Sequence, residues 1–96
     1  MNITDVQIVL VPNDERLKAY VTITIEGCFV VRDLKVIAGI DGLFVAMPAK
    51  KMKDGTFKDT AHPVNQSTRQ MIEDRILKAY HEAVQADRDD RKLKVI

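Results

Sequence analysis

Four basic side chains crowd into nine consecutive positions of this chain: Lys50, Lys51, Lys53 and Lys58. Two carboxylates, Asp54 and Asp59, lie in or beside the same stretch. A segment that projects several amines into water offers a phosphate-binding site, where lysines act as point charges that read no base sequence. The simpler interpretation is a solvated hairpin tip whose lysines only keep it soluble.

A preference for particular base sequences would need a second element whose side chains reach base edges. The polar positions of the predicted C-terminal helix are the candidates: Gln66, Arg69, Gln70, Arg75 and Lys78. Glu73, Asp74 and Glu82 favour the alternative of an ordinary solvated helix face. Stacking of unpaired bases is not expected, because only Tyr20 clearly projects an aromatic ring from the polar face of a predicted strand.

Catalytic and metal-binding patterns are missing from the sequence. His62 and His81 are isolated, with no cysteine or carboxylate at the spacing of a known metal site. No Gly-rich phosphate loop, GxSxG or HExxH occurs. His62 precedes Pro63 and is expected to hydrogen-bond the backbone between the sheet and the helix. The sequence therefore predicts a protein that is not an enzyme and needs no metal, cofactor or small-molecule substrate.

The composition limits how the chain can bind phosphate. Its 96 residues suffice for one domain, and 15 basic against 14 acidic residues give a net charge of +1. A dedicated nucleic-acid binder usually has a strongly basic balance. Any binding must therefore come from local clustering and should weaken steeply with salt. The single cysteine, Cys28, excludes an internal disulfide and is expected to be a half-buried thiol.

The N-terminus lacks the charged and apolar segments of a signal peptide. No apolar stretch approaches the ~20 residues that a membrane span needs. The sequence predicts a cytoplasmic protein without membrane insertion.

Hydrophobic alternation and turn residues predict five strands: Thr4–Val11, Leu17–Glu26, Phe29–Ala38, Leu43–Met47 and Phe57–Thr60. The second has the clearest period of two, so one of its faces should be buried. In the third, Val31 is predicted to share a side with Asp33, and Leu34 lies opposite. Apolar residues on both sides indicate a central strand, or one whose outer face meets another subunit. Pro48 should end the fourth strand.

The sequence changes to helical spacing after the last strand. Ser67 and Gln70 form a capping box, and Asn65 is a second cap candidate. We expect a single domain over residues 1–96, with a sheet in 1–64, a helix in 65–88 and a short charged tail in 89–96. The fold class is α+β, a five-stranded antiparallel sheet followed by a C-terminal helix. In so small a domain, an open sheet edge or an apolar second face favours self-association.

Several phrases of the chain resemble one family: FVVRDLKVI, GLFVAMPAK, the DG turn, and HPVN followed by TR. They resemble the SpoVG septation proteins over roughly residues 1–80. The resemblance implies homodimers that are joined through their sheets, bind DNA and RNA, and influence gene expression, septation and sporulation. It implies nucleic-acid contacts for Lys50, Lys51 and Lys53, and a role in sequence preference for Arg69. Relatives more often carry Lys-Arg-Thr-Pro after the AMP strand and a long acidic tail, and this chain has neither.

Two functional hypotheses follow. The first is a dimeric cytoplasmic regulator that binds DNA or RNA through its lysines. The alternative is a protein-interaction module of the division or sporulation machinery that uses its sheet edge or apolar outer face. Salt separates the two, because phosphate binding weakens steeply with ionic strength and an apolar contact barely changes.

Overall fold

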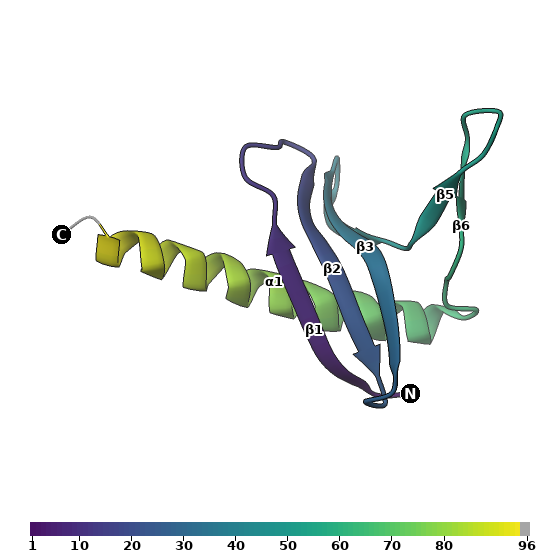
Figure 1. Cartoon of the computed structure of the whole chain (residues 1–96), viewed down its shortest axis with the longest axis horizontal. Helices are drawn as coiled ribbons and strands as arrows, with labels where there is room; N and C mark the ends of the chain where they lie inside the picture. The colour runs from purple at the N-terminus through teal and green to yellow at the C-terminus, as the bar shows by residue number, and fades with distance from the viewer. Residues whose placement is uncertain (95–96) are drawn as a thin grey trace.

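The computed structural model describes the backbone of residues 1–94 and the side chains of residues 1–91. These residues form six strands and one helix: β1 (Ile3–Leu10), β2 (Leu17–Ile25), β3 (Phe29–Gly39), β4 (Gly42–Ala46), β5 (Ala49–Lys51), β6 (Phe57–Asp59) and α1 (Gln66–Lys94). The first four strands make an antiparallel sheet in chain order, and β5 and β6 pair only with each other. The α+β class is confirmed (Figure 1).

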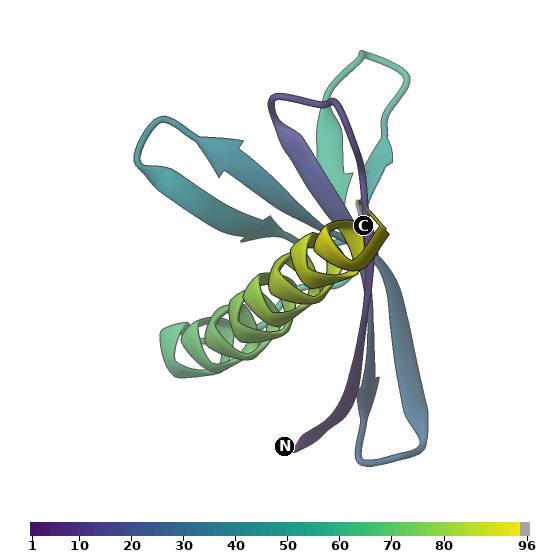
Figure 2. The same ribbon diagram turned by 90° about the vertical axis from the view of Figure 1, so that its left-hand side faces the viewer.

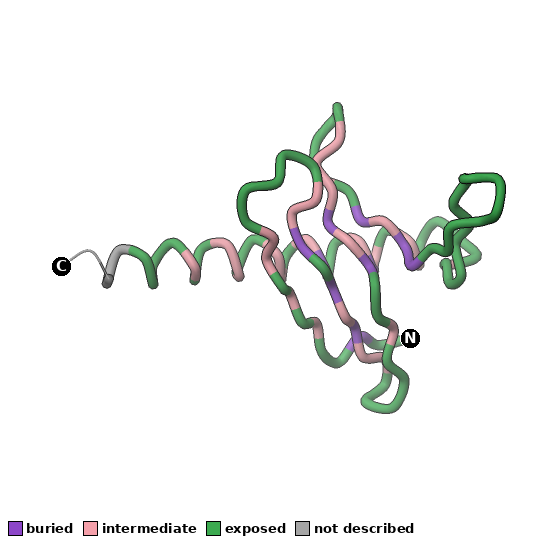
Figure 3. The backbone as a smooth tube through the Cα atoms, turned by 45° about the horizontal axis from the view of Figure 1, so that its top comes forward, coloured by how far each residue is buried: buried purple, intermediate pink, exposed green. Residues whose placement is uncertain are grey.

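One face of the four-stranded sheet is buried under α1. The alternation of β2 places Ala19, Val21 and Ile23 on this face, where all three are buried. Cross-strand pairing sets Val21 beside Ile8 on one side and Leu34 on the other, so apolar rows cross the sheet. Figure 3 shows the buried segments concentrated in the middle of the sheet. Figure 2 shows the hairpin turns pointing away from the helix.

The third strand does not keep the single period that its sequence predicts. Val31 lies on the core side together with Leu34, rather than sharing a side with Asp33. The pairing of β2 with β3 shifts register between Val21 and Ile23, and Asp33 has a φ of +67°. An extra residue in one strand turns the following side chains to the other face. The bulge therefore brings both halves of β3 onto one core, and β3 is a central strand as predicted.

The helix begins at Gln66, and Asn65 is its cap. The Asn65 Oδ1 accepts hydrogen bonds from the Thr68 N–H at 2.8 Å and from the Ser67 hydroxyl at 3.0 Å. Ser67 is therefore a donor to the cap and not the cap itself. Further along the helix, Ile72 and Ile76 lie one turn apart, and both are buried against the sheet.

The helix is longer than the predicted 65–88. It runs to Lys94, so residues 89–94 of the predicted tail are helical, and residues 95–96 lie outside the described part. Side-chain pairs one turn apart support this extension: Gln85 with Asp89, and Asp87 with Arg91 at 3.2 Å. No glycine or proline interrupts the charged run, so no stop signal ends the helix at residue 88. Figure 1 shows this end of α1 extending past the β1 edge.

The prediction of a fifth strand in the main sheet is wrong. Residues 57–59 pair with residues 49–51, which form a strand and not part of the lysine turn. Pro48 separates this hairpin from β4, because proline has no N–H to continue a ladder. The radius of gyration is 14.8 Å, against the ~12.5 Å typical of a compact chain of this length. The projecting hairpin and helix end account for the excess.

The thiol of Cys28 is exposed, in contrast to the half-buried position predicted from the sequence. Cys28 follows Glu26 and Gly27, which both have positive φ in the β2–β3 turn. The turn projects beyond the core, so its residues face solvent. Among the described residues, no helix has the length of apolar sequence that a membrane crossing requires.

Candidate nucleic-acid interface

The candidate site is the hairpin formed by β5 and β6. Its tip closes with two backbone hydrogen bonds: the Gly55 N–H donates to the Met52 carbonyl at 3.0 Å, and the Met52 N–H donates to the Thr56 carbonyl at 2.7 Å. Gly55 has a φ of +89°, which only glycine adopts without strain. This arrangement is a three-residue hairpin turn with a glycine bulge. The Asp-Gly sequence therefore sets the register of the strands.

The tip is further fixed by Asp54. Its Oδ1 accepts hydrogen bonds from the Thr56 hydroxyl at 2.6 Å and from the Thr56 N–H at 3.0 Å. Both hydrogen bonds lower the pKa of the Asp54 carboxyl, and the one from the hydroxyl has the larger effect. One of the two acidic residues near the lysines is thus occupied inside the turn.

The base of the hairpin is tied to the protein body. The Pro48 carbonyl accepts hydrogen bonds from the Thr60 N–H at 2.8 Å and from the Thr60 hydroxyl at 3.2 Å. Pro48 and the preceding Met47 are buried. Figure 1 shows the hairpin projecting from this base, away from the start of α1. The lysines are therefore held out in solvent on a defined support.

All four predicted lysines lie on this hairpin, and all are exposed. The register pairs Lys50 with Lys58, so these two ammonium groups occupy one face of the hairpin. Lys51 pairs with Phe57 on the other face, and Lys53 is in the turn. Like charges directly opposite each other destabilise a strand pair, and a bound anion would relieve the repulsion. The geometry suits a phosphate between Lys50 and Lys58.

A shallow hollow at the tip adds to this arrangement. Lys50, Lys51 and Lys53 border it, together with Met52 and Asp54. The three lysines that follow the AMP strand in the sequence therefore share one concave surface, although Lys50 and Lys51 alternate along the strand.

Arg69 is not part of the lysine hairpin. It is in the first turn of α1 and is partly buried. The other polar helix residues that were predicted to share a face with Arg69 do not all line the same surface as Arg69. A depression beside the N-terminus is lined by Gln70, Arg75 and Lys78, and Arg69 is not among its residues. The structure thus supports one lysine cluster and does not join Arg69 to it.

Phe57 belongs to this surface, although no role was predicted for it. Its side chain is 69% exposed and lies opposite Lys51. The expectation that only Tyr20 presents an exposed ring is therefore wrong. The Asp54-Gly55 turn was recognised in the sequence, but its consequence was not: residues 57–59 are the return strand of a small hairpin instead of an edge of the main sheet.

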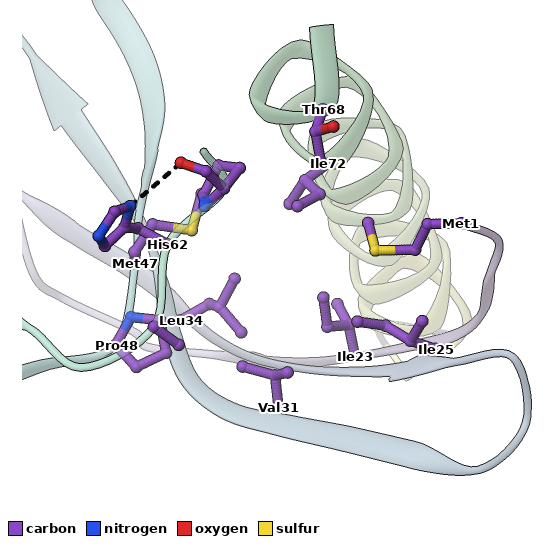
Figure 4. Close-up of a pocket in the computed structure, with 12 residues that line it drawn as sticks. Met1, Ile23, Ile25, Val31, Leu34, Met47, Pro48, His62, Thr68 and Ile72 are labelled. Carbon is purple, nitrogen blue, oxygen red and sulfur yellow. Dashed lines mark hydrogen bonds between the residues drawn. The ribbon is translucent and has the colours of Figure 1, made fainter. Parts of the chain in front are cut away.

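An apolar cavity of about 170 Å³ lies between the sheet and the start of α1. Figure 4 shows Ile23, Leu34 and Ile72 among the side chains around it. His62 borders it, and its Nδ1 lies 3.1 Å from the Pro63 carbonyl. The predicted backbone hydrogen bond of His62 is confirmed. Within the described residues, no group of three or more histidine, cysteine or acidic side chains is placed to hold a metal ion.

The pKa of Asp54 gives a test of the hairpin tip. Because the pKa is lowered in the folded protein, the stabilisation is present above pH 3.8, the ordinary value, and is lost as the pH falls through the folded value. A nuclear magnetic resonance titration of the Asp54 carboxyl carbon should give a midpoint below 3.8. In Thr56→Val, which removes only the hydroxyl donor, the midpoint should move up toward that value. An unchanged midpoint would contradict the hydrogen bond to the hydroxyl.

Comparisons with known proteins identify the family of this chain. A family model described as SpoVG matches residues 1–82. A protein of Bdellovibrio bacteriovorus is 60% identical over 86 residues, which cover 90% of this chain and 79% of the relative. One from Myxococcus xanthus is 64% identical over 80 residues, covering 83% and 80%. One from Acholeplasma laidlawii is 55% identical over 87 residues, covering 91% and 93%. Each relative is named "Putative septation protein SpoVG". The chain belongs to the SpoVG family.

Proposed function

We propose that this protein is a cytoplasmic regulator that binds nucleic acid through the β5–β6 hairpin and acts in septation and sporulation. The observation that carries the proposal is the pairing of Lys50 with Lys58 on a hairpin held away from the protein body. Two ammonium groups held opposite each other suit a phosphate bound between them. The names of the relatives support the link to septation. No catalytic step or cofactor is part of the proposal.

A titration at two salt concentrations tests nucleic-acid binding. Labelled duplex DNA and single-stranded RNA are each titrated with the protein at 50 and 200 mM salt. With three phosphate contacts, the affinity should fall about 20- to 40-fold between these conditions, because each contact releases counterions. Absence of binding at the lower concentration would contradict the proposal.

We further propose that the protein is a homodimer joined through the outer face of its sheet. Cross-strand pairing aligns Val9 with Tyr20 on this face, and both are exposed, as is Phe44. Exposed apolar side chains on an open sheet face are typical of a subunit contact, and the row of Val9 and Tyr20 continues into Lys35 of β3. A dimer would also present two hairpins, and two weak sites on one particle raise the overall affinity.

Sedimentation equilibrium tests the dimer. The wild-type protein should sediment at about twice the chain mass of 10.9 kDa. Val9→Lys combined with Tyr20→Lys should yield monomers, because the contact would then have to bury unpaired ammonium groups. The matched control is Ile40→Lys, which alters an exposed residue in the β3–β4 turn and should leave the mass unchanged. A wild-type monomer at micromolar concentration would contradict this part of the proposal.

The second candidate function is a protein-interaction module of the division machinery without nucleic-acid contact. The same apolar outer face and the net charge of +1 favour it. In that case, binding of a partner protein should change little between 50 and 200 mM salt, because an apolar contact releases no counterions.

A further inference from the structure

Phe57 has an exposed ring on the hairpin. Phosphate binding by the lysines gives this ring no role. Single exposed apolar residues are common in proteins, so exposure alone assigns no function. The surroundings of Phe57 are more specific. Lys51 lies directly opposite it, at the separation of about 5 Å typical of paired side chains. Asp59, two residues along the strand, lies on the same face, whereas Lys58 lies on the opposite face with Lys50.

The charge opposite Phe57 limits the kind of ligand that can cover its ring. An apolar partner seated on Phe57 would have to desolvate the Lys51 ammonium group opposite it. A ligand that carries both a flat ring and an anionic group avoids this cost. Nucleotides of an unpaired strand have this chemistry, since each carries a base and a phosphate.

We propose that Phe57 stacks on an unpaired base of single-stranded nucleic acid while Lys51 contacts an adjoining phosphate. This inference rests on the proposed function and narrows its substrate class. Duplex DNA would bind through phosphate contacts alone, because its paired bases are stacked inside the helix and are not offered to the ring. The protein therefore prefers unpaired strands to duplexes. RNA and DNA share the required base and phosphate.

The first test compares Phe57→Leu with Phe57→Tyr. Leucine keeps an apolar side chain and removes the ring, whereas tyrosine keeps the ring. The probes are single-stranded RNA, single-stranded DNA and duplex DNA of about twelve nucleotides, within the site size of a small domain. Phe57→Leu should weaken binding of both single strands about tenfold, within the range for loss of one stacked base. Its duplex affinity and its salt slope should match the wild type, because no charge is removed. Phe57→Tyr should bind like the wild type.

The second test observes the stacking directly. The chain contains no tryptophan, so Phe57→Trp introduces a single reporter on the hairpin. Its fluorescence should be quenched by single-stranded RNA and DNA, and much less by an equal concentration of phosphates in duplex DNA. A response to RNA alone would assign the ring to RNA and overturn the shared preference for unpaired strands.

The outcomes separate this inference from the proposed function. If Phe57→Leu binds single strands as tightly as the wild type, while replacement of Lys50 and Lys58 weakens this binding, the stacking proposal is wrong and the phosphate site stands. If the wild type binds neither single strands nor duplex, the proposed function fails and stacking fails with it. If Phe57→Leu halves the mass in sedimentation, the ring is a subunit contact and the inference is overturned.

Discussion

Replacing Lys50 and Lys58 with alanine should weaken the binding of single-stranded RNA by at least about tenfold at 50 mM salt, because two phosphate contacts are lost. The slope of log affinity against log salt should become shallower by about 1.4, or 0.7 for each contact on a single strand. The same variant should be no less stable than the wild type. The two ammonium groups face each other across β5 and β6, and removing them removes a like-charge repulsion. Fluorescence anisotropy measures the binding, and urea unfolding measures the stability.

The control for this variant removes the same amount of charge from another part of the surface. Arg88 and Arg91 are exposed on the far part of α1, so Arg88→Ala with Arg91→Ala lowers the net charge equally. If binding depended only on the overall charge of the protein, both double variants would lose the same affinity. The paired-lysine site predicts that only the hairpin variant loses it. An equal loss in both would show that the hairpin is not a local phosphate site.

Ile76→Ala should lower the free energy of unfolding by about 3 to 4 kcal/mol, since it removes a fully buried side chain and leaves a cavity. The side chain of Ile76 is 0% exposed and belongs to the core between α1 and the sheet. A small domain has a total stability of only about 5–15 kcal/mol. The loss is therefore expected to be visible as a large shift of the urea midpoint. Protein concentration must be equal for all variants, because a dimer gains stability with concentration.

Ile40→Ala is the matched control, because the chemical change is identical and only the burial differs. Ile40 is 104% exposed in the β3–β4 turn. Its substitution should change the stability by less than about 0.5 kcal/mol, as is usual on the surface. Similar losses for the two variants would contradict the packing of α1 on the sheet. A normal midpoint for Ile76→Ala would contradict it as well.

The sequence alone determined those features of the protein that depend on short-range patterns. The period of two from Leu17 onward predicted a strand with one buried face, and Ile72 and Ile76 at helical spacing predicted the buried side of α1. Pro48 predicted the end of the fourth strand. The phrases around GLFVAMPAK indicated the family, which the comparisons confirmed. In each case, the signal and the structure that it specifies lie within a few residues of each other.

The tertiary structure decided everything that depends on which strand pairs with which. The bulge at Asp33 reversed the faces of half of β3, because one extra residue turns every later side chain over. The separate pairing of β5 with β6 set Lys50 against Lys58 and left the ring of Phe57 in solvent. The lysine cluster was visible in the sequence, but its division between two faces was not. The reason is physical: side-chain periodicity fixes the faces of one strand, whereas register between strands is fixed by contacts along the whole chain.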